Sequence, residues 1–407
     1  MTGTHEVGRA SWPARYFLIT ALIPGHLLGW GVEWAFALCT AVAGAVVYPD
    51  FHARYPVVSR RALLAIAILT LVPLLSYIGT LLMNRYATGP RDWTDLIRPV
   101  LVYFSVTLGF SFGRLTLTEV RRCTRGILAF SVVVAVVLIF RVPGAATIAD
   151  TIYGSTKTAI GLTSLRVSIP FENPNFLGFF GVISLACALL FSAAPSYVTA
   201  GVCLAAIALT GSRTAWLTAL MVVLLFAGST ALMATGIARA SRRVRIALPF
   251  TVSVIVIIGA LPWLQSVWEN NQRFLDFIDG LLTLQLLNEA SYVERQEMRL
   301  QAWHLISERL FLGWGALKHS DVEVIDNQYV SLLLRGGVVG LGAAVLAGAA
   351  ALFTHVRAHR STIQRAQALA VWVIVLAWLW SGQFIENTRL AVLAFMMLGA
   401  TTADADA

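Results

Sequence analysis

Two groups of side chains in this sequence could carry chemistry. The first lies between Gly313 and Gly340, where a polar segment runs directly into an apolar helix that is predicted to begin near Asp326. This segment holds groups that carry charge or exchange protons: Lys318, His319, Asp321, Glu323, Asp326 and Arg335. Charges crowded beside an apolar span are costly, so they indicate a functional site. For Lys318, His319 and Glu323, a solvated loop is the commoner role.

The second group consists of arginines that could bind an anion. Arg213 opens an apolar run, and Arg166 and Arg299 lie in the two longest polar segments. The planar guanidinium group suits paired hydrogen bonds to phosphate oxygens. Taken alone, Arg213 is equally consistent with an arginine that extends to the membrane interface.

A helix start with polar side chains lies ahead of another apolar run, at Asn173-Pro174-Asn175. Asn173 is a suitable N-cap residue, and proline is favoured in the first turn of a helix. Both asparagines are also candidates for ligand contact. Plain capping is the commoner role of such a sequence.

The composition defines the elements that must position these side chains. The 407 residues are 58% hydrophobic and 13% charged, with a mean hydropathy of +0.75, which indicates a polytopic membrane protein. The net charge of +9 comes from basic residues scattered among short connectors, so no nucleic-acid partner is expected. The four cysteines show no disulfide or zinc pattern.

Apolar runs predict an all-α architecture of twelve membrane spans in one integral membrane domain, residues 1–407. They fall near 16–30, 32–48, 62–83, 96–113, 122–141, 174–193, 196–211, 213–235, 246–264, 327–354, 366–381 and 387–402, and the last three occupy 327–402. A continuous helix from Asp326 would place Gly337 and Gly340 on its own face, below the carboxylate. Glycines there would let a neighbouring helix approach closely.

The distribution of basic residues predicts the orientation, with both termini in the cytoplasm. Residues 142–173 form an external loop in this arrangement, and residues 265–326 form a large one. An amphipathic helix is expected in the second loop, because apolar residues recur there at helical spacing: Val293, Leu300, Trp303, Ile306 and Leu310. The sixth, eighth and tenth spans would begin outside, where their free N–H groups favour an anion.

The order of these motifs resembles the O-antigen ligase and O-antigen polymerase family of bacterial envelope glycosyltransferases, most strongly over residues 160–345. The matching pieces are Arg166 with Phe-Glu-Asn-Pro-Asn-Phe-Leu-Gly at 171–178, Gly-Ser-Arg-Thr-Ala at 211–215, Arg299 with Trp303 and Leu-Gly-Trp-Gly at 312–315, and Asp326-Asn327 with Gly337 and Gly340. Asp326 stands where the ligases of the family have histidine, and aspartate there is more similar to the polymerases.

The resemblance implies glycan transfer from a polyprenyl-diphosphate carrier to an acceptor hydroxyl, on the outer face of the bacterial cytoplasmic membrane. The partners would be the lipid-linked oligosaccharide donor, a glycan or lipid acceptor, and membrane lipids; no metal and no cofactor is expected. Such a reaction needs a base for the acceptor proton and cations for the departing diphosphate. Asp326 is the expected base, with His319 as its competitor. Arg213 and Arg299 are the expected diphosphate ligands, and Arg166, Asn173, Asn175, Asn327 and His319 are expected to contact substrate.

Three alternatives remain open from the sequence. An O-antigen ligase would use the same donor but transfer the glycan to a lipid or protein. A secondary transporter would carry charges near the middle of the membrane in two related halves, whereas the charges here gather at one face. A non-catalytic component of polysaccharide export would share the layout without turnover.

Overall fold

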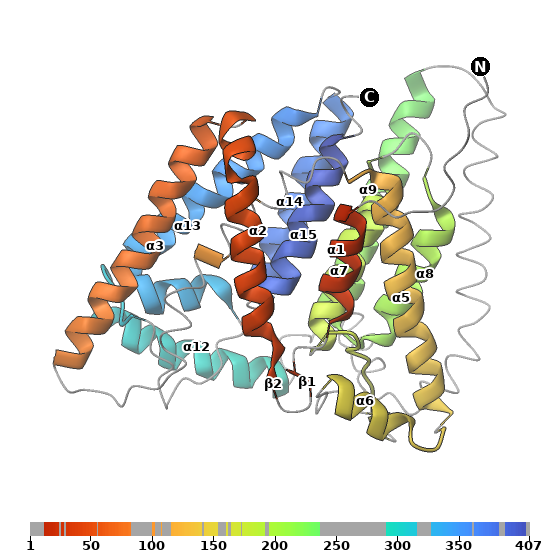
Figure 1. Ribbon diagram of the computed structural model, residues 1–407, viewed down its shortest axis with the longest axis horizontal. Coiled ribbons are helices and arrows are strands. Elements are labelled where there is room, and N and C mark those ends of the chain that lie inside the picture. Colours follow the sequence, from red (N-terminus) through yellow and green to blue (C-terminus); the bar gives the residue numbers. More distant parts are fainter. Residues whose placement is uncertain are drawn as a thin grey trace.

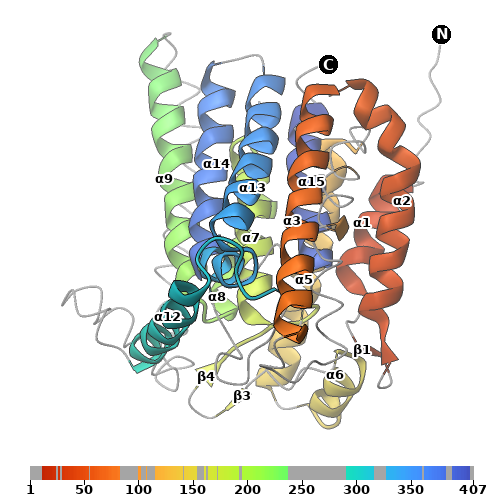
Figure 2. The same cartoon turned by 90° about the vertical axis from the view of Figure 1, so that its left-hand side faces the viewer.

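The computed structural model of the chain is a bundle of helices that stand side by side (Figure 1, Figure 2). It describes residues 12–23, 26–27, 30–54, 56–82, 100–101, 107, 115–140, 142–153, 160–161, 164–171, 173–191, 195–236, 290–315, 327–359, 362–381 and 387–403. The helices are α1 (Trp12–Leu22), α2 (Val32–Arg54), α3 (Pro56–Leu82), α5 (Leu117–Ile139), α6 (Ala145–Tyr153), α7 (Pro174–Leu189), α8 (Tyr197–Leu209), α9 (Arg213–Gly236), α12 (Ala290–Glu308), α13 (Gln328–Ala358), α14 (Thr362–Ser381) and α15 (Thr388–Ala403).

The prediction of a helical protein is confirmed, since the strands in the described part of the chain are two minimal antiparallel pairs. These are β1 (His26–Leu27) with β2 (Trp30–Gly31), and β3 (Ile160–Gly161) with β4 (Ser164–Leu165). Ten of the twelve predicted spans overlap described helices. The first, predicted at 16–30, is wrong in its second half, because α1 ends at Leu22 and the chain then forms the pair β1 and β2. The spans at 96–113 and 246–264 lie largely or wholly outside the described residues, so the number twelve stays a prediction.

Among the described helices, α5 and α13 are long and apolar enough to cross a bilayer. Shorter apolar stretches occur in α3, α7, α8, α9, α14 and α15. Length and composition by themselves would also fit the core helices of a large soluble protein. The composition of the whole chain is therefore the main evidence that this is a membrane protein.

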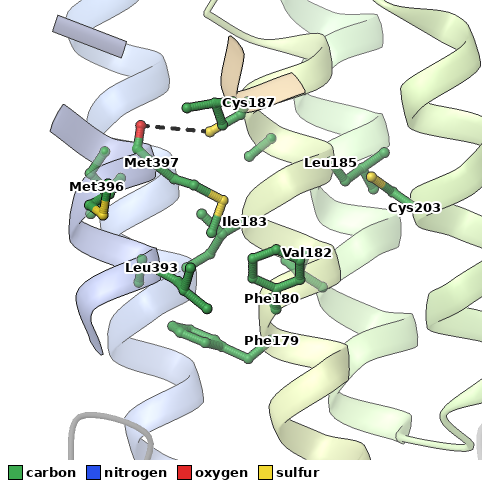
Figure 3. Close-up of a cluster of buried hydrophobic side chains, with 14 of the residues drawn as sticks. Phe179, Phe180, Val182, Ile183, Leu185, Cys187, Cys203, Leu393, Met396 and Met397 are labelled. Atoms are coloured by element: carbon green, nitrogen blue, oxygen red, sulfur yellow. Dashed lines mark hydrogen bonds between the residues drawn. The ribbon is translucent and has the colours of Figure 1, made fainter. Parts of the chain in front are cut away.

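Helix α7 forms the centre of the larger core. It is apolar on all sides, as expected for a helix surrounded by others, and it packs against α8, α9 and α15. Figure 3 shows its aromatic and branched side chains beside Leu393, Met396 and Met397 of α15. A Cβ atom on Gly181 would lie 2.8 Å from Cγ1 of Ile207 in α8, so glycine permits the close approach of these two helices.

The predicted loops 142–173 and 265–326 contain described helices, α6 and α12, and both lie at the same end of the bundle (Figure 1, Figure 2). Helices α7 and α9 begin close together, because a Cβ atom on Gly178 would lie 2.8 Å from Cβ of Ala215. Trp378, near the end of α14, contacts the same point, 3.4 Å from that Cβ position. Which side of a membrane this end of the bundle faces stays a prediction.

Candidate functional site

The start of α7 carries two of the predicted site residues, and a third, Arg166, reaches it from the preceding segment. Asn173 is the N-cap, and its side-chain oxygen accepts a hydrogen bond of 2.9 Å from the backbone N–H of Asn175. Pro174 occupies the first turn, so the predicted helix start is confirmed. The half-buried Arg166 donates from Nη2 to Oδ1 of Asn175 at 3.5 Å. The structure therefore brings Arg166 and Asn175 together, and it gives Asn173 the capping role that was the commoner expectation.

A backbone contact connects this region to the start of α9. The N–H of Val167, next to Arg166, donates to the carbonyl oxygen of Leu209 at the end of α8, at 3.0 Å. The chain then turns through Gly211, whose φ is 59°, and α9 begins at Arg213. The backbone of Arg213 thus lies at the predicted helix start, beside the start of α7; its side chain lies outside the described side chains.

A second arginine at this end of the bundle was not singled out from the sequence. Arg389, in the first turn of α15, is buried and donates from Nη2 to the carbonyl oxygens of Ala21 and Pro170, at 3.1 and 3.0 Å. Its guanidinium also lies over the ring of Phe171, 5.4 Å from the centroid. Arg389 therefore fixes the segment that carries Arg166. The available signal was an arginine in the first turn of the last apolar run.

The expected continuous helix after Asp326 is wrong, because α13 is broken at Gly337. The backbone there has φ 60° and ψ −161°, which is not helical, and the two parts of α13 run in different directions (Figure 1). Gly337 is therefore not a residue on the face of a continuous helix that begins at Asp326, and the expected role of letting a neighbouring helix approach that face does not apply to it. Its left-handed φ is a conformation that favours glycine.

Residues 310–315, which include the Leu-Gly-Trp-Gly segment, supply the hydrogen bonds that the broken helix needs. Before the break, the carbonyl oxygens of Leu334 and Arg335 accept from the N–H groups of Trp314 and Gly315, at 2.7 and 2.9 Å. After the break, the N–H groups of Val338 and Val339 donate to the carbonyl oxygens of Leu310 and Phe311, at 2.8 and 3.3 Å. These four bonds satisfy groups that a helix end would otherwise leave unpaired.

Glycines make this crossing sterically possible. Gly313 and Gly315 have φ values of 68° and 89°. A Cβ atom on Gly313 would lie 2.6 Å from the carbonyl carbon of Arg335, and one on Gly315 would lie 2.6 Å from the backbone nitrogen of Tyr77 in α3. The glycines at 313, 315 and 337 thus belong to one structural unit, in which the loop passes between α3 and the break in α13.

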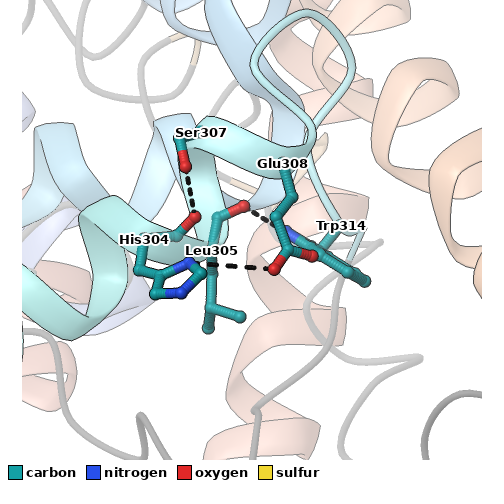
Figure 4. Close-up of polar contacts among 5 residues, drawn as sticks. All are labelled: His304, Leu305, Ser307, Glu308 and Trp314. Carbon is teal, nitrogen blue, oxygen red and sulfur yellow. Dashed lines mark hydrogen bonds and ion pairs between the residues drawn. The ribbon is translucent and has the colours of Figure 1, made fainter.

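Trp314 joins α12 to the first part of α13. Its indole Nε1 donates to the carbonyl oxygen of Leu305 at 2.7 Å (Figure 4), and the guanidinium of Arg309 lies 4.3 Å from its ring centroid. The ring belongs to a small core with Ala302, Ile306, Val330 and Leu334. Helix α12, which carries Arg299, is therefore held against the part of α13 that follows Asp326 and Asn327.

The buried face of α12 differs from the apolar face expected from helical spacing. Ile306 is buried as expected, and Ala302 is buried with it, whereas Leu300 and Trp303 are exposed. The reason is that α12 packs on the short first part of α13, which offers a narrow contact surface. Arg299 lies in α12 by its backbone, and its side chain is outside the described side chains.

Asn327 is fully buried at the N-cap of α13. Its Oδ1 accepts from the N–H groups of Tyr329 and Val330, at 2.9 and 3.1 Å. Its Nδ2 has no hydrogen-bond acceptor in the described part of the chain, and a buried amide donor without a partner is costly. The hydroxyl of Tyr329 donates to the carbonyl oxygen of Leu376 in α14, at 2.9 Å. This contact ties the capped end of α13 to the helix that also touches α7 and α9.

The remaining predicted site residues fall outside the described part of the chain. Asp326 and His319 are among them, as are Lys318 and Glu323. Within the described residues no three His, Cys, Asp or Glu side chains gather at one point. The absence of a metal from the reaction stays a prediction.

Comparison with known families bears on this same region. Residues 198–345 match the family model described as O-antigen ligase. The matched region contains the motifs at 211–215 and 312–315, together with Arg299, Asn327 and Gly337, while Arg166 and the start of α7 lie ahead of it. No curated protein matches the chain. The resemblance seen in the sequence is thus confirmed over α8, α9, α12 and the first part of α13.

Proposed function

We propose that this chain, whose residues 198–345 place it with the O-antigen ligase family of bacterial membrane proteins, transfers a glycan from a polyprenyl-diphosphate carrier to an acceptor hydroxyl. The family match supports a polysaccharide-related glycan transfer at a membrane. The carrier, the absence of a metal, and the outer face of the cytoplasmic membrane as the place of reaction are parts of the proposal.

One structural observation carries the proposal furthest. The break at Gly337 and the loop at 309–315 hold the capped end of α13 against α12, and Asn327 presents there a buried Nδ2 donor. The proposed proton acceptor, Asp326, directly precedes the N-cap of α13, and Arg299 belongs to α12, the helix that packs against the first part of α13.

The proposed chemistry assigns one role to each group. Asp326 accepts the proton of the acceptor hydroxyl, whose oxygen then bonds to the anomeric carbon of the glycan. The bond from that carbon to the diphosphate breaks, and the carrier leaves as the diphosphate anion. Arg213 and Arg299 stabilise the charge that develops on it. Arg166, Asn173, Asn175, Asn327 and His319 are assigned to substrate contact.

Among the glycan transferases, a polymerase is proposed first because Asp326 occupies the position at which the ligases have histidine. The ligase is the second candidate, and the family match is compatible with both. The two enzymes use the same donor and differ in the acceptor. Product analysis with each acceptor present separately therefore distinguishes them.

The deciding experiment supplies the purified protein, in liposomes, with a polyprenyl-diphosphate-linked oligosaccharide. A polymerase lengthens the lipid-linked glycan, whereas a ligase moves it onto an added lipid or protein acceptor. A protein that inserts and folds normally but forms neither product would overturn the proposal. Translocation of donor without transfer would favour the transporter reading.

Substitutions then test the assigned roles. Asp326→Asn retains the shape of the side chain but removes its basicity, so transfer should fall about 10²- to 10⁴-fold. Arg213→Lys and Arg299→Lys retain the charge and lose the planar fork, so each should lower the rate about 10²- to 10³-fold. Arg15→Lys, at an exposed position of α1, is the matched control. If His319→Ala abolishes transfer while Asp326→Asn leaves it intact, the base has been misassigned.

A further inference from the structure

An apolar surface on the described end of the predicted loop 265–326 has no role in the proposed chemistry. It consists of Leu300, Trp303, Leu310, Phe311 and Leu312, each of which is exposed. Phe311 is the most exposed of them at 72%. Three consecutive exposed apolar residues are unfavourable in a water-filled loop, so a specific environment for this surface is indicated.

The contacts of this segment with α3 establish its depth in the bundle. Ser76 in α3 donates from its hydroxyl to the carbonyl oxygen of Leu312 at 2.6 Å. Gly315 lies against Pro73 and Tyr77, because a Cβ atom there would be 2.9 Å from the carbonyl oxygen of Pro73 and 2.6 Å from the nitrogen of Tyr77. The apolar stretch of α3 runs from Leu63 to Gly79 and contains all three contact points.

The loop contacts α3 well inside that helix and not at its end. Ser76 and Pro73 lie six and nine residues before Leu82, the last residue of the helix, which is about 9 to 14 Å at a rise of about 1.5 Å per residue. Exposed apolar side chains of α3, namely Leu71, Leu75, Ile78 and Leu82, occur on both sides of this level. The loop therefore crosses α3 within the part of that helix that presents apolar side chains outward.

The backbone carbonyl groups of this loop are hydrogen-bonded, as expected for a segment within the hydrocarbon layer of a membrane. The carbonyl oxygens of Leu310, Phe311 and Leu312 accept hydrogen bonds from Val338, Val339 and Ser76 respectively. Irregular backbone at the depth of the hydrocarbon is tolerated only where its polar groups are paired inside the protein. These three carbonyl groups are paired inside the protein, while the side chains of the same residues are exposed.

Helix α12 carries the boundary of this surface. The exposed side chains of His304 and Glu308 lie beside each other, with Nδ1 and Oε1 3.7 Å apart (Figure 4). Trp303 precedes His304 and is half-exposed. Tryptophan is enriched at the boundary between membrane and water. The apolar character thus rises from α12 toward Phe311, as it would along a segment that enters a bilayer.

We propose that residues 310–312 form a re-entrant, lipid-facing segment, covered by phospholipid acyl chains of the leaflet at the α12 end of the bundle. Trp303 then marks the interface, and the predicted loop 265–326 is external only ahead of this point. This inference concerns embedding and does not rest on glycan transfer.

The test uses the full-length protein in liposomes made only of phospholipid. Cys39, the exposed native cysteine, is replaced by serine, and a nitroxide spin label is attached to Cys introduced at Phe311, at Leu312 or, as the matched control, at His304. We then measure how often the spin label collides with oxygen and with a water-soluble nickel chelate. Oxygen concentrates among the acyl chains, whereas the chelate stays in water. Labelling of the protein without an added cysteine gives the background from the buried thiols at 123, 187 and 203.

We expect oxygen collisions to exceed nickel collisions at 311 and 312, and the reverse at 304. A label at 303 should give an intermediate ratio. Nickel accessibility at 311 and 312 equal to that at 304 would show that water covers the segment and would overturn the proposal. Labels that are immobile and closed to both reagents would also overturn it, since protein would then cover the surface. Two adjacent positions are used so that failure of one variant to fold does not decide the result.

Discussion

The backbone N–H of Trp314 donates a hydrogen bond to the carbonyl oxygen of Leu334, 2.7 Å away, across the break in α13. The indole of the same residue donates to Leu305 in the last turns of α12, also at 2.7 Å. One residue thus satisfies a carbonyl of the broken helix and holds the neighbouring helix in place. The two sides of the proposed site, α12 with Arg299 and α13 with Asn327, are connected through it.

The same contact explains why glycines are needed in two motifs that lie far apart in the sequence, Leu-Gly-Trp-Gly at 312–315 and Gly337. The segment 310–313 contacts the break directly: a Cβ atom on Gly337 would lie 2.3 Å from the carbonyl carbon and oxygen of Phe311, and one on Gly313 would lie 2.7 Å from the backbone nitrogen of Gly336. A side chain at either place would separate the loop from the break. The four hydrogen bonds across the break would then lose their geometry.

Replacing Gly337 by alanine should therefore destabilise the folded protein. Alanine at φ 60° costs about 1–3 kcal/mol in backbone strain alone, and the contact with Phe311 adds to it. The expected result is a lower midpoint of thermal unfolding in detergent together with loss of glycan transfer.

Gly342→Ala is the control for that substitution. Gly342 lies in the same helix, and nothing lies within 4 Å of an added Cβ atom, so the unfolding midpoint should not fall. Equal midpoints for the two variants would contradict the steric role assigned to Gly337.

Trp314→Phe tests the connection between α12 and α13. Phenylalanine keeps an aromatic ring beside Arg309 but cannot donate to the carbonyl oxygen of Leu305, which should cost about 1–3 kcal/mol of folding free energy. The free energy of unfolding is measured in mixed detergent micelles. Trp303→Phe, at an exposed position of α12, should leave the free energy of unfolding unchanged. A similar loss in both variants would show that the Nε1 hydrogen bond is not the cause.

Much of the helical layout follows from the sequence, because long apolar runs determine helices in a membrane. Ten predicted spans overlap described helices, the first of them only in part, and the start of α7 at Asn173 and Pro174 is confirmed, since an N-cap and a first-turn proline act locally. The segment after Asp326 was misread for a related reason. The run from Gln328 to Ala358 is predominantly apolar, and its glycines, Gly336 and Gly337 among them, are also compatible with an unbroken membrane helix, so the sequence alone does not fix the break.

The break could not be predicted locally because its stabilisation is not local. Gly337 adopts its conformation beside Phe311, which is 26 positions earlier in the chain. Arg389 was missed for the same reason, because its two carbonyl partners, Ala21 and Pro170, lie in other parts of the sequence. The pairing of Arg166 with Asn175 spans nine residues, and both had been chosen as candidates from the sequence.

At the opposite end of the bundle, His359 should make stability depend on pH. It follows the last turn of α13, stacks on Phe191 at 5.4 Å between centroids, and has no hydrogen-bond partner for either ring nitrogen among the described residues. Burial, and to a lesser extent the charge of Arg365, together lower the pKa of His359 from its ordinary 6.5 to about 4. The neutral imidazole is thus favoured by the fold.

The sign of the effect follows from that lowered pKa. Above pH 6.5 the residue is neutral in both the folded and the unfolded chain, so its contribution is constant; between about 6.5 and 4 the unfolded chain takes up the proton first, and stability falls. Unfolding midpoints measured from pH 8 to pH 4 should show a shallower decline in His359→Gln than in the parent. His304→Gln, at an exposed position, should keep the parent slope, and an unchanged slope in His359→Gln would contradict the prediction.

Asn327 allows capping and substrate contact to be separated. Asn327→Ala removes the acceptor for the N–H groups of Tyr329 and Val330, so it should cost about 0.5–2 kcal/mol of stability. Asn327→Asp keeps a capping oxygen and adds a negative charge that suits a helix N-terminus. It removes only the Nδ2 donor, which has no protein acceptor among the described residues.

If Nδ2 binds the diphosphate or the glycan, Asn327→Asp should unfold at the parent temperature and yet transfer glycan about 10- to 10²-fold more slowly, as expected for one hydrogen bond to a charged group. Steady-state transfer rates and unfolding midpoints are measured on the same preparations. Asn387→Asp makes the same change at the start of α15, where Oδ1 of Asn387 accepts from the N–H of Leu390 at 3.0 Å, and it should alter neither quantity. Full transfer activity in Asn327→Asp would mean that Asn327 serves as a helix cap and that the donor contact belongs to another residue.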